Sequence, residues 1–346
     1  MRALQVIENG QPLIINDVSE PEPAAGEVIV KVAHCGLCHT DLHLHDGHFG
    51  LGGDKKLSLS QSLPLTMGHE IQGTVHRVGT GVSGLPIGDS VAVYPWIGCG
   101  DCGLCTTARE HLCARARAIG VNVAGGYAQY VRVPSAKYVL PIGAVDPRQA
   151  ALLMCSGISA FSALSKVETA FAAGRVAIIG FGGLGHMAVA LAKARFGTVP
   201  VVLDVNADKL AQARALGCEA FDLAADDAIK TIKRETGGIS AVVDFVGSDA
   251  TSQAAGRLCG QAGHIVVVGL FGGELRTPLP PLALRGTTIQ GSYVGTLDDA
   301  KAVLELAATG QLNAIPVTDC TLDQGNDAFS TLRSGNAEGR IIFNIS

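Results

Sequence analysis

From about residue 172 the chain alternates between short apolar runs and segments with the composition of helices. The apolar runs lie at 175–179, 201–204, 241–246 and 263–269. Runs that are apolar throughout, rather than at every second residue, are typical of parallel strands that are covered on both faces. Helical segments follow the first two runs, an alanine-rich one near 187–192 and one at 207–216 that Gly217 ends. We therefore predict an α/β fold with a doubly wound parallel sheet.

A glycine motif of the form G-x-G-x-x-G follows the first apolar run. Its glycines are Gly180, Gly182 and Gly185, with Gly183 and Leu184 inside the motif. A chain with 44 glycines contains such triplets by chance. The prediction therefore depends on the position of this triplet between a predicted strand and a predicted helix. In that context the glycines permit a tight turn, close approach to a pyrophosphate and close helix–strand packing. The motif predicts a dinucleotide-binding loop.

An acidic residue follows at the end of the next predicted strand. Asp204 lies 19 residues after Gly185. A carboxylate there accepts hydrogen bonds from ribose hydroxyls and repels a 2′-phosphate, which favours NAD over NADP. Lys209, five residues on, is a second candidate for contact with the ribose.

Four cysteines lie within 15 residues, in the pattern C-x2-C-x2-C-x7-C. They are Cys99, Cys102, Cys105 and Cys113. Four thiolates complete the tetrahedral shell of Zn²⁺ and leave no position for a substrate, so we interpret the cluster as a structural zinc site. Disulfides are disfavoured because the chain begins with a strand-like run rather than a secretory signal. The gap of seven and the following Ala114 disfavour an iron–sulfur cluster, and the net charge of −5 disfavours a nucleic-acid-binding zinc ribbon.

Length and composition indicate a large, ordered protein. A chain of 346 residues is expected to form two domains. With 47% hydrophobic and only 16% charged residues, the composition argues against disorder. No apolar stretch is long enough to cross a bilayer, and the charge favours neither nucleic acid nor an anionic membrane as a partner. Ten cysteines without a signal sequence indicate a reducing, cytoplasmic location.

The regions outside the parallel sheet are less regular. The first 150 residues or so have the pattern of irregular β structure, with short apolar runs at 28–32 and 91–94 between glycines and prolines. Residues 46–63 read as a long loop, which in a compact domain is often a functional lid or an interface element. In the tail we expect a helix near 298–309 and a final strand at 340–343.

Further thiols and imidazoles offer ligands for a second, open metal site. Cys38, His69 and Cys155 leave a fourth tetrahedral position for an oxygen ligand, as catalytic zinc requires. Spacing alone does not select these three from ten cysteines and ten histidines. Cys35 and Cys38 form a C-x-x-C pair, so a redox pair is an alternative to packing of Cys35 beside a metal ligand.

A resemblance to a known family makes that selection. Gly68-His69-Glu70, the run 88–91, the cysteine quartet and the glycine motif resemble the zinc-dependent alcohol dehydrogenases of the medium-chain dehydrogenase/reductase family, along essentially the whole chain. The loop 46–63, Tyr94-Pro95-Trp96 and the run 152–158 are similar to the tetrameric bacterial and archaeal branch. The resemblance implies a GroES-like, β-rich catalytic domain at 1–154 and 292–346 and a Rossmann NAD-binding domain at 155–291.

The resemblance also implies roles for individual residues. Cys38, His69 and Cys155 would hold a catalytic zinc ion, with Glu70 beside the metal and Asp41 orienting His69. Thr40 matches the hydroxyl that takes the proton of the alcohol, and His43 matches the histidine that passes it to solvent. The remaining matches are Arg340 and His39, which would face the cofactor pyrophosphate, and Trp96, which would line the substrate pocket.

The function implied is hydride transfer between NAD and a primary or secondary alcohol, or the matching aldehyde or ketone. Two zinc ions per subunit and a homotetramer are expected from the resemblance, with a dimer as the alternative. Family members specific for polyol, aryl, cyclic or thioester-linked alcohols are rival interpretations. A sensor that binds NAD and zinc without catalysis, and a thiol-redox protein built on Cys35 and Cys38, are rivals of another class.

Overall fold

The computed structural model describes residues 1–59 and 61–345, and these form two compact units. The first unit comprises Met1–His48, Ser58–Ile158 and Gly295–Ser346, and the second comprises Phe49–Leu57 and Ser159–Val294. Residue 60 of the predicted loop 46–63 lies outside the described residues. The domain boundaries that we predict from the sequence, at 154/155 and 291/292, stay predictions.

The first unit is built on a seven-stranded sheet with the order β10-β8-β7-β3-β18-β17, in which β9 also pairs with β3. Its pairs are antiparallel except for β17 with β18. The two longest strands, β3 and β7, lie side by side, so the residues at their ends are held in register. The strands of this sheet are β3 (Val28–Leu37), β7 (Glu70–Val78), β8 (Ser90–Val93), β9 (Tyr130–Val133), β10 (Val139–Pro141), β17 (Val317–Thr321) and β18 (Arg340–Asn344). A smaller sheet has the order β2-β1-β6, made of β1 (Arg2–Val6), β2 (Ile14–Asp17) and β6 (Leu65–Thr66).

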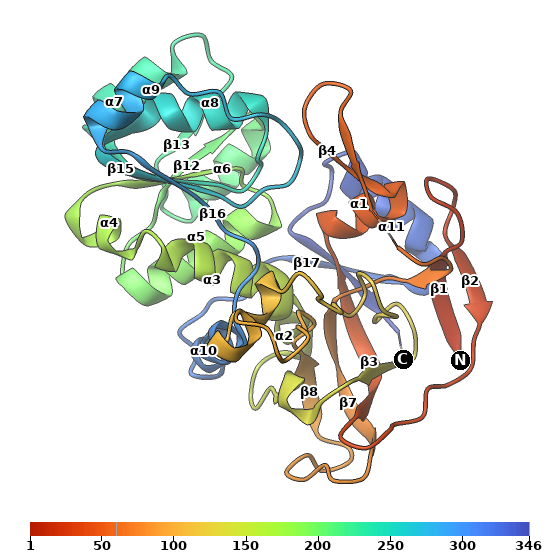
Figure 1. The fold of residues 1–346 in the computed structure, drawn as a ribbon. Helices are drawn as coiled ribbons and strands as arrows, with labels where there is room; N and C mark the ends of the chain where they lie inside the picture. Colours follow the sequence, from red (N-terminus) through yellow and green to blue (C-terminus); the bar gives the residue numbers. More distant parts are fainter. Residues whose placement is uncertain (60, 346) are drawn as a thin grey trace. The chain divides into compact units, whose positions relative to one another are not determined.

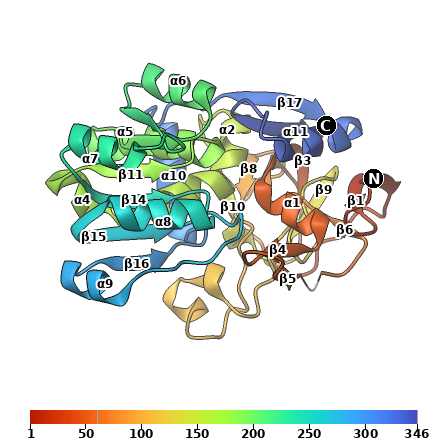
Figure 2. The same cartoon turned by 90° about the horizontal axis from the view of Figure 1, so that it is seen from above.

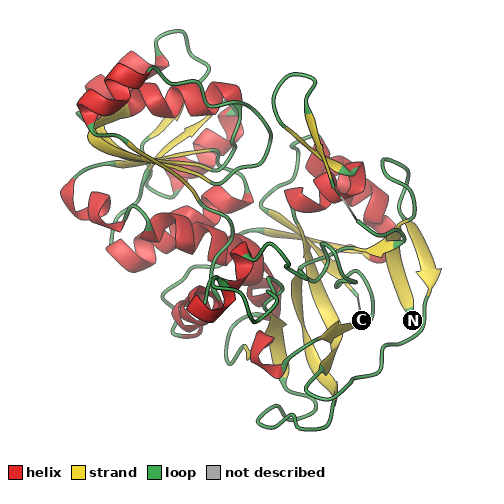
Figure 3. Ribbon diagram, viewed as in Figure 1, coloured by secondary structure: helices red, strands yellow, loops and turns green. Residues whose placement is uncertain are grey.

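This unit also contains short helices, and Figure 3 shows that most of the rest of it is strand and loop. The helices are α1 (His39–Asp46), α2 (Pro147–Leu152), α10 (Leu297–Ala308) and α11 (Gly325–Arg333), with three-residue 3₁₀ turns at η1 (Cys105–Thr107), η2 (Glu110–Leu112), η3 (Ala136–Tyr138) and η5 (Leu322–Gln324). A π-helical turn, η4 (Leu153–Gly157), connects α2 to α3 (Ile158–Ser165). The prediction of a helix near 298–309 is confirmed, and a capping box between Thr296 and Asp299 explains where it begins. The predicted final strand is β18.

The second unit holds a six-stranded sheet with the order β13-β12-β11-β14-β15-β16, in which every pair is parallel. In Figures 1 and 2 helices cover both of its faces, with α7, α8 and α9 on the side opposite α5. The strands are β11 (Val176–Ile179), β12 (Val201–Asp204), β13 (Ala220–Asp222), β14 (Ile239–Asp244), β15 (Cys259–Val267) and β16 (Thr288–Gly291). The helices are α4 (Glu168–Ala173), α5 (Gly183–Phe196), α6 (Ala207–Ala215), α7 (Ala228–Thr236), α8 (Asp249–Leu258) and α9 (Leu279–Arg285). The predicted doubly wound parallel sheet is confirmed.

Two predicted strands of this sheet begin and end earlier than expected. The run predicted at 241–246 is β14, which ends at Asp244, and the run at 263–269 is β15, which ends at Val267. The Asp244 side chain accepts hydrogen bonds from the backbone amides of Val246 and Gly247 at 2.9 and 3.0 Å. This turn of the backbone after Asp244 ends the ladder, although apolar residues continue beyond it.

The prediction of a loop at 46–63 is wrong for two short segments. Strands β4 (His48–Gly50) and β5 (Lys56–Ser58) pair with each other as a hairpin. Within the second unit, Lys55 of this hairpin forms an ion pair with Glu274 at 2.8 Å. No helix among the described residues is long and apolar enough to cross a membrane.

Candidate metal centres and cofactor loop

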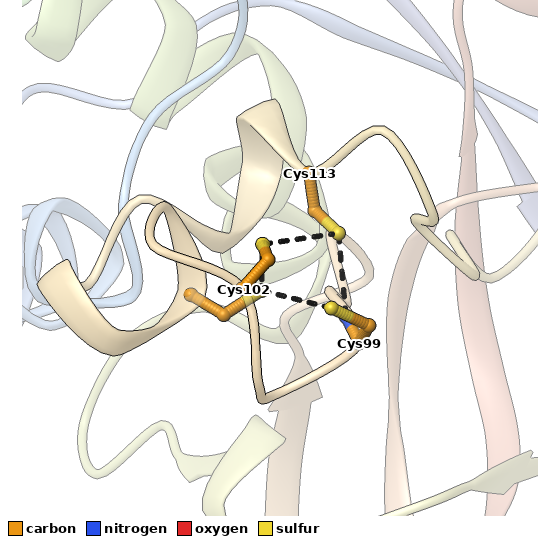
Figure 4. Close-up of side chains that lie close together, drawn as sticks. Cys99, Cys102 and Cys113 are labelled. Carbon is orange, nitrogen blue, oxygen red and sulfur yellow. Dashed lines mark hydrogen bonds between the residues drawn. The ribbon is translucent and has the colours of Figure 1, made fainter.

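The cysteine quartet forms one compact cluster on the segment between β8 and β9, around the turns η1 and η2. Figure 4 shows Cys99, Cys102 and Cys113 turned toward one another. The Sγ of Cys105 lies 3.8 Å from that of Cys99 and 3.5 Å from that of Cys102, which in turn lies 3.8 Å from the Sγ of Cys113. A zinc ion about 2.3 Å from each of four sulfurs sets neighbouring sulfurs about 3.8 Å apart, so the cluster fits a four-sulfur zinc site.

Backbone amides and one guanidinium surround the sulfurs of the quartet. The amides of Cys99 and Arg115 donate to the Sγ of Cys113 at 3.4 and 3.3 Å, and the Arg115 guanidinium lies 3.2 Å from the Sγ of Cys99. Hydrogen bonds from the backbone amide and the side chain of Cys105 lower the pKa of Cys102 to about 6. The carboxylate of Asp101, which accepts from the Cys99 thiol, raises the pKa of Cys99 to about 12. A metal ion that binds at the quartet would have to displace a proton, mainly from Cys99.

A second cluster joins three distant segments of the first unit. It contains Cys38, His69, Glu70 and Cys155, whose ligand atoms all lie within 4.8 Å of one another, and all four are buried. Cys38 precedes α1 as its N-cap, His69 immediately precedes β7, and Cys155 lies in the π-helical turn η4. The Sγ atoms of Cys38 and Cys155 are 3.9 Å apart, a separation that suits two ligands of one zinc ion.

The cluster leaves polar atoms that an ion would satisfy. The Nε2 atom of His69 has no hydrogen-bond partner, although the side chain is fully buried. Buried polar atoms without partners are rare in proteins, and a bound ion is one way to satisfy them. The Cys155 and His69 side chains, close to the sulfur of Cys38, lower the pKa of that thiol well below its usual value, so it offers a thiolate. The residues present therefore fit a zinc ion with three protein ligands.

Asp41 and Tyr127 hold the histidine side of this cluster. One carboxylate oxygen of Asp41 lies 3.5 Å from Nδ1 of His69, which leaves Nε2 to face the thiols. The other oxygen accepts hydrogen bonds from the Cys38 amide at 2.9 Å and from the Tyr127 hydroxyl at 2.8 Å. Sequence reasoning missed Tyr127, because nothing local connects it to Asp41 and only its complete burial marks its hydroxyl as one that requires a partner.

Glu70 and Arg340 form a buried ion pair at the edge of the cluster. One guanidinium nitrogen of Arg340 lies 2.5 and 2.6 Å from the two oxygens of Glu70 and 3.0 Å from the carbonyl oxygen of Leu37. Burial raises the pKa of Glu70 to about 7, although the nearby Arg340 opposes that shift. A Cβ atom at Gly36 would overlap the Glu70 carboxylate, so only glycine fits there. The role of Arg340 toward a cofactor pyrophosphate stays a prediction.

Trp96 lies beside the second cluster rather than on the surface. Its ring centroid is 5.3 Å from that of His69, and its indole Nε1 donates to the carbonyl oxygen of Met154 at 3.1 Å. Because Met154 adjoins Cys155, this hydrogen bond connects the indole to a ligand-bearing turn. The predicted part of Trp96 in a substrate pocket stays a prediction.

Helix α1 carries the predicted proton-transfer residues away from Cys38. Thr40 and His43 are three residues apart, so they share one face of the helix. His43 is half-buried, and burial lowers the pKa of its imidazole even though Asp46 and Cys38 oppose the shift. The ring is therefore neutral at neutral pH and able to accept a proton. His39, the first residue of α1, is exposed.

The glycine motif of the second unit connects β11 to α5 as predicted. Gly180 has a φ of +94°, and a Cβ atom on it would meet Val246 at 2.7 Å. A Cβ atom on Gly185 would overlap the carbonyl oxygen of Gly180, which is the close helix–strand packing expected of the third glycine. Open space surrounds the corresponding position on Gly182, the N-cap of α5, so a pyrophosphate can approach the backbone there. Gly183 and Leu184 are the first residues of α5.

Asp204 is the last residue of β12 and forms a hydrogen bond with this loop. Its Oδ2 accepts a hydrogen bond from the Phe181 amide at 2.6 Å, and its Oδ1 accepts from the amides of Val205 and Asn206 at 2.8 and 2.9 Å. Lys209 lies one turn into α6, where the Asn206 side chain caps its backbone amide. The structure thus brings Asp204 to the glycine loop, while the contact of Lys209 with a ribose stays a prediction.

Several other cysteines and histidines have ordinary surroundings. All ten cysteines are free, so Cys35 and Cys38 form no disulfide in this structure, and burial raises the pKa of Cys35. Cys218 and Cys259 are buried as core residues, and Cys320 is partly buried. His34 and His48 form hydrogen bonds with Asn344 and the carbonyl oxygen of Asp46.

Comparisons with known proteins agree with this architecture. Residues 24–144 match the family model for the alcohol dehydrogenase GroES-like domain, and residues 183–309 match that for zinc-binding dehydrogenases. An NAD-dependent alcohol dehydrogenase of Sulfurisphaera tokodaii is 35% identical over 345 residues, covering 98% of this chain and 99% of that protein. An alcohol dehydrogenase of Geobacillus stearothermophilus is 37% identical over 349 residues, covering all of both chains.

Solved structures give the same result. The alcohol dehydrogenase of the archaeon Aeropyrum pernix superposes with a TM-score of 0.90 at 33% identity, covering 99% of this chain and 100% of the other. A cobalt- and zinc-bound alcohol dehydrogenase of Pyrobaculum aerophilum has a TM-score of 0.82 at 26% identity, covering 99% of each chain. With two metal-ligand clusters and a dinucleotide loop on one chain of matching length, the protein belongs to the zinc-dependent alcohol dehydrogenases of the medium-chain dehydrogenase/reductase family.

Proposed function

We propose that this protein transfers a hydride between NAD and a primary or secondary alcohol, or the matching aldehyde or ketone, at a catalytic zinc site. The observation that carries the proposal is the buried cluster of Cys38, His69 and Cys155, from which α1 runs with Thr40 and His43 on one face. A set of three nitrogen and sulfur ligands leaves a coordination position open, unlike the closed quartet at Cys99–Cys113.

The chemistry divides between the bound groups and the residues of this chain. When bound, zinc supplies a Lewis acid for the substrate oxygen, and NAD supplies the hydride acceptor. The Thr40 hydroxyl accepts the proton of the substrate hydroxyl as it passes its own proton on, and the neutral imidazole of His43 takes up that proton and releases it to solvent. Asp41 keeps His69 in one orientation, and Glu70 beside the ligands is held by Arg340.

The cofactor loop supports NAD. The Gly180–Gly185 turn offers backbone amides to the pyrophosphate, with Asp204 placed to accept from the ribose hydroxyls. We expect Asp204→Gly to reduce the preference for NAD over NADP by about tenfold or more, since the charge that repels a 2′-phosphate is lost. Asp204→Asn is the matched variant, because it keeps an oxygen for the Phe181 amide and removes only the charge. Unchanged kcat/KM ratios for the two cofactors in both variants would show that Asp204 does not read the ribose.

The rival functions differ in what they predict. Specificity for polyol, aryl, cyclic or thioester-linked alcohols would change the substrate and leave the zinc chemistry in place. A sensor that binds NAD and zinc needs no proton path, so the presence of Thr40 and His43 on α1 favours an enzyme. A homotetramer in the cytoplasm completes the proposal, supported by the resemblance to the tetrameric branch and by ten free cysteines.

The test follows NADH absorbance while primary, secondary, aromatic and cyclic alcohols are offered with NAD. We expect turnover with the wild type, and Cys155→Ala to lose one zinc ion per chain and at least ~100-fold in turnover. Cys320→Ala, a partly buried cysteine outside both clusters, is the matched control and keeps both. Full zinc and NAD binding without turnover on any alcohol or carbonyl compound would support the sensor instead.

A further inference from the structure

One polar side chain is buried at the start of the helix that follows the glycine motif. His186, which adjoins Gly185 in α5, is only 6% exposed. The other buried residues of α5 are a glycine and apolar side chains. An imidazole among them requires a partner, because a buried polar group without a hydrogen bond costs free energy.

The partner of the His186 ring is the carbonyl oxygen of Gly182, the N-cap of α5. The backbone amide of His186 donates to this oxygen at 3.0 Å, and Nδ1 of the ring lies 3.1 Å from the same oxygen. A carbonyl oxygen can only accept, so Nδ1 carries the proton and donates it. Burial lowers the pKa of His186, although its hydrogen bonds with Gly182 and Gln212 oppose the shift, so the ring is neutral at neutral pH.

Packing explains the ring of His186 but not its nitrogen. The imidazole lies against the fully buried ring of Phe181, with 4.0 Å between the centroids and 30° between the planes. A phenylalanine at position 186 would make the same kind of contact. The Gly182 carbonyl already accepts the helical hydrogen bond from the His186 amide, so it does not need a second donor to be satisfied. The ring nitrogen therefore adds something else, which is a second restraint on the direction of this carbonyl.

A fixed carbonyl also fixes the amide on the other side of the same peptide bond. The peptide unit is planar and trans, so the N–H of Gly183 points opposite to the C=O of Gly182. That carbonyl points into α5 toward its two donors on His186, and the Gly183 amide therefore points out of the N-terminal end of the helix. Amides of the first helical turn have no partner within the helix and are the donors that bind phosphate groups.

The two residues joined by this peptide bond, Gly182 and Gly183, are the kind that needs a restraint. Glycine loses more conformational freedom on being fixed than any other residue, and a Cβ atom on Gly182 would meet only open space. The preceding residue is held by Asp204, which accepts from the Phe181 amide at 2.6 Å. His186 supplies the restraint on the following side, so the loop holds its amide in place before a ligand binds.

From the joint occurrence of this buried imidazole, its hydrogen bond to the Gly182 carbonyl and the glycines that it restrains, we propose that His186 is a positioning residue for the pyrophosphate of NAD. Its Nδ1–H holds the Gly182–Gly183 peptide so that the Gly183 amide donates to the pyrophosphate. His186 acts through the backbone rather than by contact with the cofactor. The inference rests on the cofactor site proposed above and adds to it a residue outside the glycine motif.

The test measures NADH affinity by fluorescence titration of the zinc-loaded protein, together with the melting temperature, in two variants that divide the side chain. His186→Phe keeps a ring against Phe181 and loses the donor. We expect it to melt close to the wild type but to raise the Kd for NADH about five- to tenfold, the size of one hydrogen bond. His186→Asn places an amide nitrogen where Nδ1 lies and loses the ring, so it should melt lower but bind NADH within about twofold of the wild type.

Competition against NADH locates the effect within the cofactor. His186→Phe should bind ADP-ribose about five- to tenfold more weakly than the wild type but adenosine equally well, because only ADP-ribose carries the pyrophosphate. His264→Phe is the matched control, since it changes a half-buried histidine on β15 of the same unit, outside the glycine loop. It should keep the wild-type affinity for NADH and for ADP-ribose.

Equal weakening of NADH binding in His186→Phe and His186→Asn would assign the effect to packing and overturn the proposal. Wild-type affinity in His186→Phe, or an equal loss for adenosine and ADP-ribose, would overturn it as well. A wild type that binds no NADH would refute the proposed cofactor site itself, and this inference with it.

Discussion

The cysteine quartet takes its four ligands from residues 99–113, whereas the Cys38 cluster brings together ligands as far apart as Cys38 and Cys155. The quartet is only partly buried and is supported by backbone amides and an exposed arginine. The Cys38 cluster is buried throughout, and buried side chains on other elements support it. A local cluster of this kind depends little on the rest of the fold, while the distant one exists only if β3, β7 and η4 pack correctly.

The largest effect is expected when variants of the two clusters are compared, because we assign a structural role to the quartet and a catalytic role to the Cys38 cluster. Cys102→Ala/Cys113→Ala should lose one zinc ion per chain and lower the melting temperature, because binding energy at a structural site is folding energy. The molecules of this variant that remain folded should keep turnover within a few-fold of the wild type, in contrast to Cys155→Ala. Zinc analysis, calorimetric melting and turnover on the same samples measure this. If the quartet variant, while still folded, lost turnover as fully as Cys155→Ala, the assignment of structural and catalytic roles would be wrong.

Arg340→Gln tests the charge that the distant cluster buries. It leaves the Glu70 carboxylate in a fully buried position without its partner, so we expect a loss of about 3–5 kcal/mol in the free energy of unfolding, measured in urea. The double variant Glu70→Gln/Arg340→Gln removes both charges and should be less destabilised than Arg340→Gln alone. Equal losses in the two variants would show that packing, rather than the ion pair, sets the effect.

Tyr127→Phe removes one hydroxyl that reaches the proposed metal ligand His69 through Asp41. Asp41 then loses a buried hydrogen bond, which we expect to cost about 1–3 kcal/mol in stability and 10–100-fold in zinc affinity at the Cys38 cluster. Competition with a chelator, followed by zinc analysis, gives the affinity. Tyr130→Phe, on β9 in the same unit, is the control and should retain the wild-type affinity; a matching loss there would mean that Tyr127 has no particular part in holding the site.

Asp46→Asn tests the far end of the helix that leads away from Cys38. Burial would raise the pKa of Asp46, but two hydrogen bonds from Arg333 at 2.7 Å and one from His45 outweigh it, so the pKa is lowered. A lowered carboxylate pKa stabilises the fold above the unfolded-state pKa of about 3.9, and this contribution is lost as pH falls through the folded-state value. The variant should therefore melt slightly below the wild type at neutral pH, with the difference beginning to shrink below about pH 4 and disappearing once the pH is below the lowered folded-state pKa. A difference independent of pH would contradict the charge-based explanation.

The smallest effect is expected at the rim of the quartet. Arg115 pairs with Asp101 and contacts Cys99 in full exposure to solvent, where ion pairs contribute little. Arg115→Gln should leave both the zinc content and the melting temperature close to those of the wild type. A zinc loss as large as that of Tyr127→Phe would remove the contrast between a locally supported cluster and one that depends on the fold.

Prediction from the sequence succeeded where the signal was local. The strands β11 and β12, the helix α10 and the glycine turn follow from apolar runs, caps and the motif itself. The quartet was visible because all four ligands lie within one short segment. The resemblance, rather than spacing, selected Cys38, His69 and Cys155. The hairpin of β4 and β5 was missed because each strand is only three residues long and the segment between them is rich in glycine.

The sequence by itself determined the parallel sheet, its cofactor loop and the local metal cluster, because each depends on hydrophobic periodicity or on ligands a few residues apart. Only the tertiary structure decided that Tyr127 supports Asp41 and that Arg340 neutralises Glu70. These contacts join residues tens to hundreds of positions apart. No local propensity specifies such a contact, since it forms only when packing of the strands and helices removes the intervening water and brings the charged groups within hydrogen-bond distance.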